Sequence, residues 1–137
     1  MPDSAEEPGL ELTPPDGQPL PSLPRFSWGA FLVPPVWGVA HGLWAGVFFL
    51  PLWAFVDNLA RSSSNGPLWM RGLALLAGIG TLAFQYEYAS TANRLAWRRS
   101  GGRLSLEAFL RRERLWAVGG VVTIAVLAVW AGTYLSR

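Results

Sequence analysis

The strongest constraint in this sequence is a set of long apolar runs that carry almost no charge. No Asp, Glu, Lys or Arg occurs between residues 26 and 56, only Arg71 interrupts the run over 68–86, and residues 115–135 contain none. About 20 apolar residues suffice for a helix to cross the hydrocarbon core of a bilayer. Charged residues make up only 15% of the chain, below the roughly 25% that is typical of soluble domains. The sequence therefore predicts an all-α membrane protein with about three transmembrane helices.

Prolines divide the first apolar run, which is too long for one span. Pro34 and Pro35 interrupt it, and a proline pair is tolerated in the first turn of a helix but breaks its interior. Residues 26–35 are therefore expected to form a short interfacial or re-entrant helix, although the pattern also allows them to span. The transmembrane helices are predicted over residues 36–56, 68–88 and 115–135.

The first 25 residues differ in composition from the rest. Residues 2–24 hold seven of the eleven prolines and five acidic residues, and no basic residue precedes Arg25. So few apolar side chains cannot offset the entropy of ordering the chain. We therefore expect residues 1–25 to form a disordered, proline-rich acidic tail, either a solvated leader or a docking segment. The tail lacks the positive start and the apolar run of a signal peptide.

Arginine is concentrated between the last two apolar runs. Residues 91–114 contain seven arginines against two glutamates. Gly101 and Gly102 predict a helix stop, and Ser105 predicts the N-cap of a short helix within this basic loop. The arginines are expected to meet anionic lipid headgroups at the membrane surface, and a protein partner is the alternative. Phosphate chemistry is the least favoured interpretation, because no Gly-rich phosphate loop follows a strand. The seven arginines are Arg94, Arg98, Arg99, Arg103, Arg111, Arg112 and Arg114.

The same asymmetry predicts the orientation in the membrane. Basic residues in short loops stay on the cytoplasmic side, and the connector over 57–67 has one arginine against the seven of 91–114. The basic loop and the N-terminal tail are therefore predicted to be cytoplasmic. If residues 26–35 span instead, the tail moves to the other side.

Gly38, Gly42 and Gly46 form a doubled GxxxG pattern in the predicted first span. Glycines at this spacing share one face of a helix and allow another helix to approach closely. They predict a helix-packing face, and the partner helix is either in this chain or in another copy. The alternative is that small residues are simply frequent in membrane helices.

His41 and Glu87 are the candidates for a polar site in the membrane. A polar side chain in hydrocarbon is costly and is a functional candidate by default. His41 is interpreted as a structural hydrogen-bonding group, a proton or substrate site, or a metal ligand. It is the only histidine, and no second metal ligand lies near it in the sequence, so no metal site is predicted. Glu87 lies at the end of a span, where polar residues are normal.

No catalytic constellation is present in the sequence. Cysteine is absent, which excludes disulfides and thiolate chemistry, and no motif indicates a bound cofactor. The net charge is only +2, and the arginines crowd beside apolar spans. A membrane surface is therefore a better partner than nucleic acid.

Two short aromatic motifs carry a family resemblance. The first comprises Phe26, Ser27, Trp28, Ala30, Phe31 and then Trp37; the second comprises Asn93, Ala96, Trp97, Glu107, Phe109 and Trp116. Together they resemble a family of small bacterial multi-pass inner-membrane proteins of unknown function. This chain has Ser27 where such proteins often carry Asn, and Leu106 in place of an acidic residue. The resemblance implies a bacterial cytoplasmic membrane protein with helices on both sides of a basic loop, and it implies no activity.

The sequence therefore predicts a non-enzymatic integral membrane protein, and the resemblance implies that its membrane is the bacterial inner membrane. It is expected to act through helix packing, as a subunit of a larger complex or as a homo-oligomer. The alternative is a small transporter or lipid-handling protein with a polar path at His41.

Overall fold

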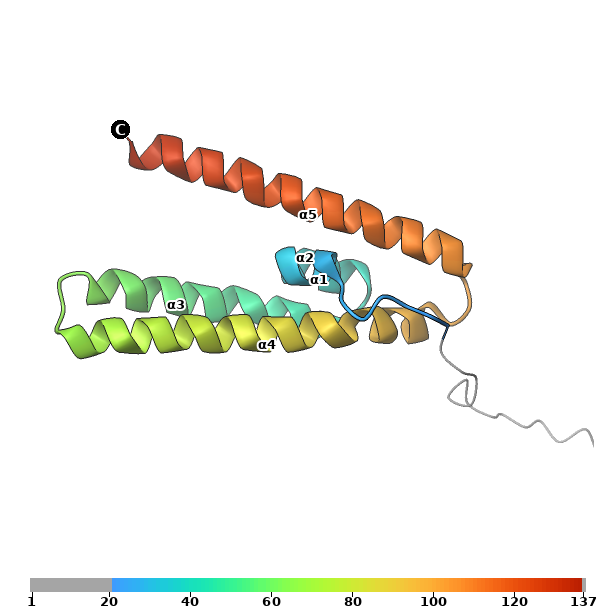
Figure 1. Cartoon of the computed structure of the whole chain (residues 1–137), viewed down its shortest axis with the longest axis horizontal. Coiled ribbons are helices and arrows are strands. Elements are labelled where there is room, and N and C mark those ends of the chain that lie inside the picture. The colour runs from blue at the N-terminus through green and yellow to red at the C-terminus, as the bar shows by residue number, and fades with distance from the viewer. Residues whose placement is uncertain (1–20, 137) are drawn as a thin grey trace, which may run out of the picture.

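The structure is a computed structural model that describes residues 21–136, and this part of the chain is all-helical. Two long helices dominate it, and shorter helices lie beside the first of them and between the two (Figure 1). The elements are α1 (Trp28–Leu32), α2 (Pro34–Ala40), the 3₁₀ helix η2 (Trp44–Phe48), α3 (Phe49–Ser63), α4 (Leu68–Ser100) and α5 (Leu106–Leu135). Most of the predicted tail, residues 1–20, lies outside the described residues.

The connection between the two long helices forms as its local sequence predicts. α4 ends at Ser100, and its C-cap Gly101 has a φ of 57°, a left-handed conformation that glycine adopts without a Cβ clash. α5 begins after Ser105, whose hydroxyl accepts a hydrogen bond from the backbone N–H of Ala108 at 3.2 Å. The predicted helix stop and N-cap are both confirmed. Within the predicted basic loop over 91–114, only residues 101–105 are non-helical. The rest of this segment forms the end of α4 and the start of α5.

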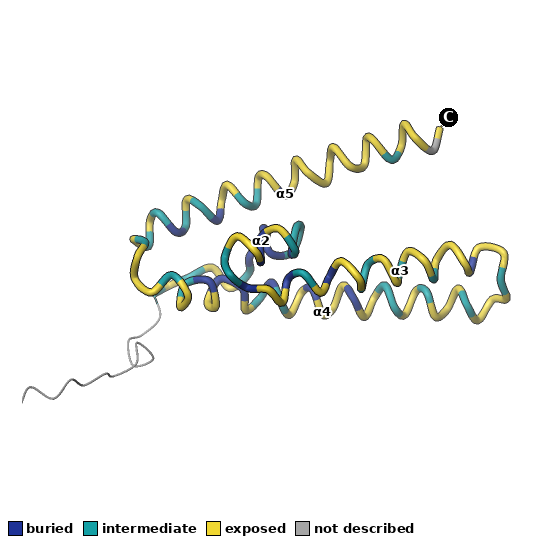
Figure 2. The backbone as a smooth tube through the Cα atoms, turned by 180° about the vertical axis from the view of Figure 1, so that it is seen from behind, coloured by how far each residue is buried: buried dark blue, intermediate teal, exposed yellow. Residues whose placement is uncertain are grey.

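α3 and α4 form an antiparallel hairpin (Figures 1 and 2). The indole N–H of Trp53 on α3 donates to the side-chain oxygen of Gln85 on α4 at 2.7 Å. Farther along, a Cβ on Gly78 would lie 3.7 Å from Val56, an ordinary van der Waals contact. At the turn, Arg71 on α4 donates to the backbone carbonyls of Ser63 and Ser64 at 3.3 Å and 3.0 Å. Polar contacts near both ends and close apolar packing therefore hold the two helices together.

The α1–α2 pair forms a wedge between the C-terminal half of α4 and the N-terminal half of α5 (Figure 1). The backbone N–H of Ser27 donates to the carbonyl of Ala89 at 3.0 Å, and the amide of Asn93 donates to the carbonyl of Pro24 at 3.0 Å. On the other side, a Cβ on Gly29 would lie 2.7 Å from the Cβ of Trp116. Because only glycine permits this approach, α1 packs tightly against α5.

The structure differs from the predicted first span over 36–56, which does not form one helix. α2 ends at Ala40, and Gly42 has a φ of 70°, which terminates the helix and reverses the chain. Gly38 and Gly46 then face each other across the reversal: a Cβ on Gly38 would lie 3.1 Å from the Cα of Gly46. The doubled GxxxG pattern therefore permits a tight reversal within the chain instead of lining one helix face.

Two helices of the described chain, α4 and α5, are long and apolar enough to cross a membrane. Most of their side chains are exposed in the apolar halves (Figure 2), as expected for surfaces that face lipid. α3 has 15 residues, fewer than the roughly 20 that a perpendicular span requires. Two of the three predicted spans thus correspond to long apolar helices, and the third is not confirmed.

Candidate functional site

A buried carboxylate joins the wedge to α5. One oxygen of Glu113, Oε2, accepts hydrogen bonds from the hydroxyl of Ser27 and the indole N–H of Trp37, both at 3.1 Å. The other oxygen, Oε1, lies 3.0 Å from Nε2 of His41. The side chains of His41 and Glu113 are only 4% and 9% exposed. The four residues form one polar cluster that is almost completely removed from solvent.

His41 contacts both its own helix and α5. Its Nδ1 lies 2.8 Å from the backbone carbonyl of Trp37, and because a carbonyl only accepts, a hydrogen bond there requires a proton on Nδ1. Its Nε2 lies 3.0 Å from Oε1 of Glu113. Both of these atoms are buried, so the ring and the carboxylate face each other away from solvent.

Helix termini position the members of the cluster. Ser27 is the N-cap of α1, and its hydroxyl accepts from the N–H of Ala30 at 3.2 Å while it donates to Glu113. His41 is the C-cap of α2, and its ring stacks on Trp37 with 4.1 Å between ring centroids. The side chains of Ser27 and His41 are thus each held by a hydrogen bond to the backbone of their own short helix, in addition to their contact with Glu113 on α5.

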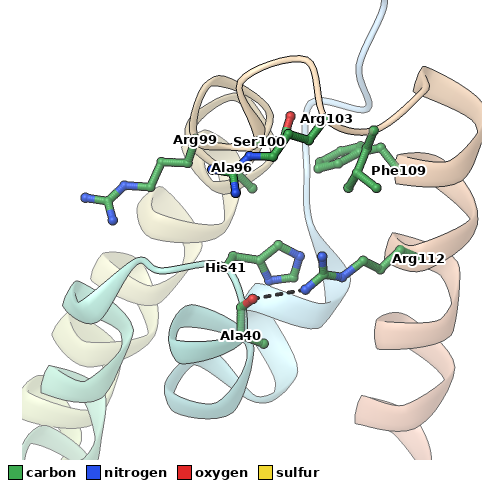
Figure 3. A pocket seen from close by; sticks show the side chains of 9 residues that line it. Ala40, His41, Ala96, Arg99, Ser100, Arg103, Phe109 and Arg112 are labelled. Carbon is green, nitrogen blue, oxygen red and sulfur yellow. Dashed lines mark hydrogen bonds between the residues drawn. The ribbon is translucent and has the colours of Figure 1, made fainter.

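A pocket of about 340 Å³ opens beside His41, between the end of α4 and the start of α5 (Figure 3). Three arginines line it together with the histidine: Arg99, Arg103 and Arg112. We call this site the arginine pocket. No Asp or Glu is among its lining residues.

Two of these arginines also hold the C-terminal end of α2. Arg112 donates to the carbonyl of Ala40 at 3.0 Å, and Arg99 donates to the carbonyl of Gly42 (Figure 3 shows the first contact). Cations are favourable at a helix C-terminus because the helix dipole is negative there. A guanidinium carries five N–H donors, so both groups keep donors for another ligand.

The positive charge of the arginine pocket is not neutralised within the described residues. The ion pairs in residues 21–136 join His41 to Glu113 and Arg61 to Asp57, and neither involves an arginine of the pocket. Unneutralised guanidinium groups beside a small cavity favour an anion, and phosphate oxygens match their paired N–H donors best.

The remaining predicted site residues do not line the arginine pocket. The other four arginines are exposed on the same helix ends: Arg94, Arg98, Arg111 and Arg114. Glu87 is exposed on α4 and is not part of the polar cluster. The structure therefore combines His41 with arginines, and not with Glu87.

Sequence reasoning did not identify Ser27, Trp37 and Glu113 as site residues. Glu113 stands among arginines, as a solvated surface residue would. Its helical phase is the signal that could have identified it, because Phe109 and Trp116 lie four residues before and three after it. Residues at these spacings share one face of a helix, and that face is apolar and inward.

Neither a protein-family model nor a curated protein nor a solved structure matches this chain. The resemblance to small bacterial inner-membrane proteins therefore stays a prediction. No group of three or more metal-ligating side chains occurs within residues 21–136.

Proposed function

We propose that this chain is a multi-pass protein of the bacterial cytoplasmic membrane that binds a phosphate-bearing anion in the arginine pocket. The observation that supports this proposal is a cavity that three arginines line and that no carboxylate lines. The proposed role is binding and not catalysis. Membrane lipid headgroups and free phosphate esters share this chemistry, and a lipid headgroup is the source that a membrane surface supplies in excess.

The arrangement of the helices supports the proposed orientation. All seven arginines of 91–114 lie at the ends of α4 and α5 that meet at residues 101–105 (Figure 1). The positive-inside rule assigns such an end to the cytoplasm. The apolar halves of both helices extend away from this end, so the arginine pocket would lie at the cytoplasmic surface. The antiparallel packing of α3 on α4 supports a further crossing by η2 and α3.

Binding to the detergent-purified chain tests the proposal. Arg103 is the variant of choice, because its side chain forms no hydrogen bond or ion pair within residues 21–136, so Arg103→Gln removes charge from the pocket without breaking a contact of the fold. Arg98→Gln is the matched control, since Arg98 is exposed at the same end of α4 and does not line the pocket. The two probes are glycerol 3-phosphate in solution and phosphatidylglycerol added to the micelles.

We expect Arg103→Gln to weaken binding by about tenfold, because a charge-assisted hydrogen bond contributes on the order of 1.5–3 kcal/mol. The control should bind as the unchanged chain does. Binding of both probes identifies the phosphate group itself as the ligand, while binding of phosphatidylglycerol alone identifies a lipid headgroup. Equal affinities for the Arg103 and Arg98 variants would overturn the assignment to this pocket.

A second candidate function is assembly through helix packing, which four glycines favour. A Cβ added to any of them would meet nothing within 4 Å: Gly72 and Gly80 on α4, and Gly119 and Gly132 on α5. Glycine inside a helix costs about 1 kcal/mol relative to alanine, and no contact within the described chain requires it at these positions. Gly80→Leu should weaken a homo-oligomer or a complex in light scattering of the purified protein, and an unchanged mass would count against assembly.

A further inference from the structure

A second hollow lies along α5, and none of the residues that line it also lines the arginine pocket. It has a volume of about 450 Å³, and its lining residues come from α5, from the irregular segment before α1 and from α4. Its polar lining residues are Ser22, Ser27, Asn93, Glu113 and Arg114. The carboxylate of Glu113 is already engaged, because Ser27 and Trp37 donate to it. A smaller hollow of about 280 Å³ adjoins it, and its lining residues are all apolar: Trp28, Leu32, Ala117, Val118, Val121 and Val122.

The two hollows form one continuous groove along α5. Both are lined by Trp28 and Ala117, so they meet at these residues. The lining changes along the helix, from Arg114 at the polar end to Val121 and Val122 at the apolar end. At 1.5 Å per residue, this change occurs over roughly 12 Å.

The direction of the groove matches the direction of a lipid in a bilayer. Its polar end lies where α5 still carries arginines, and its apolar end lies inside the uncharged run over 115–135. An amphiphile with its headgroup at Arg114 would therefore place its chain against Leu32 and Val122, at the depth of lipid tails. A soluble ligand would not match a lining that becomes wholly apolar at one end.

The polar end also has unsatisfied hydrogen-bonding capacity. The side-chain nitrogen of Asn93 donates to the carbonyls of Pro24 and Phe26, which fixes the orientation of the amide. Its oxygen, Oδ1, is buried and has no partner in the described chain. A buried acceptor without a donor costs about 1–3 kcal/mol, so a hydroxyl-bearing ligand at this end would be stabilised. Arg114 is exposed and forms no ion pair among residues 21–136.

We propose that this groove binds one anionic glycerophospholipid whose headgroup carries a hydroxyl. The guanidinium of Arg114 binds the phosphate, and the side-chain oxygen of Asn93 accepts from a headgroup hydroxyl. One acyl chain lies along α5 between Trp28 and Val122. The groove shares no lining residue with the arginine pocket, so this inference does not depend on the proposed function.

Native mass spectrometry of the full chain tests the groove. The chain carries Arg103→Gln so that the arginine pocket contributes little, and the micelles contain equal amounts of phosphatidylglycerol and phosphatidylcholine. Ala117→Leu fills the junction of the two hollows. Ala125→Leu is its matched control, because Ala125 is exposed on the same helix and lines neither hollow.

The background chain should retain one phosphatidylglycerol molecule, and Ala117→Leu should lower the retained fraction by about tenfold. Ala125→Leu should leave it unchanged. Arg114→Gln, at an exposed position that the fold tolerates, should abolish the preference over phosphatidylcholine, whereas Arg111→Gln should not. The proposal fails if no lipid is retained, if the two alanine variants behave alike, or if Arg114→Gln keeps the preference.

Discussion

At the scale of single residues, Glu113 holds the wedge in place. Its carboxylate is the shared partner of His41, Ser27 and Trp37. We expect Glu113→Leu to lower the free energy of unfolding by about 3–5 kcal/mol, because it leaves one partner of a buried pair without the other. Thermal unfolding in detergent, followed by tryptophan fluorescence, measures the loss.

Glu107 provides the control for this prediction. It is an exposed glutamate on the same helix, so Glu107→Leu should change the stability by about 0.5 kcal/mol or less. The double variant His41→Leu with Glu113→Leu should be more stable than Glu113→Leu alone, because no buried polar atom of the pair is left without a partner. Equal effects of the two glutamate variants would contradict the structural role of the pair.

The difference between Ser105 and Glu113 shows what the sequence can predict at this scale. An N-cap depends on residues within one turn of helix, so Ser105 was predictable from its neighbours. The environment of Glu113 depends on α1 and α2, which pack against it from a distant part of the chain. Local composition around Glu113 indicates solvent, and only the helical phase of Phe109 and Trp116 indicates the opposite.

At the scale of elements, the reversal after α2 depends on two glycines with different constraints. Gly42 requires a positive φ, and a Cβ on Gly46 would collide with the backbone carbonyl of Pro34. We expect Gly46→Ala to destabilise the protein by roughly 1–3 kcal/mol, the usual range for overpacking a close contact. Gly72→Ala should be neutral or stabilising by up to about 1 kcal/mol, because Gly72 is helical and faces open space.

The melting temperatures of the two variants test these expectations: Gly46→Ala should melt lower than the unchanged protein, and Gly72→Ala should not. The oligomeric mass of each variant is measured alongside. Stable Gly46→Ala protein with an altered mass would support the helix-packing face predicted from the GxxxG pattern. The pattern could not distinguish the two structures, because the same four-residue spacing suits a helix face and a reversal whose arms pack on each other. The positive φ of Gly42 is the feature that distinguishes the reversal from a continuous helix. A backbone angle of this kind cannot be read from the spacing of glycines in a sequence.

At the scale of the whole molecule, the lengths of the uncharged runs predict the two long helices, but they do not predict the wedge. Uncharged runs identify α4 and α5 because lipid requires apolar side chains along the whole crossing. The wedge forms from residues 26–40, whose apolar side chains would suit a span equally well. Its polar contacts with Ala89, Asn93 and Glu113 determine its place, and these partners are far away in sequence.

The proposed topology predicts opposite accessibility for the two turns. The chain has no cysteine, so a single introduced thiol gives an unambiguous label. In membrane vesicles of known orientation, Glu107→Cys should react with an impermeant maleimide from the cytoplasmic side, and Asn65→Cys from the other. Both positions are exposed, so both can react. They lie at opposite ends of α4, and labelling of both from one side would therefore contradict the proposed crossing of the membrane by this helix.

The long sequence separations within the polar cluster have a consequence for biogenesis. Glu113 is synthesised 86 residues after Ser27 and 76 residues after Trp37. A ribosome that adds 5–20 residues per second reaches it about 4–17 seconds later. During that interval the N-terminal wedge has no carboxylate to receive its donors, so the cluster cannot close before the start of α5 has been synthesised. The closed cluster therefore marks a chain that has been synthesised at least as far as Glu113, and a chain terminated before this residue would leave the donors of Ser27 and Trp37 without their acceptor.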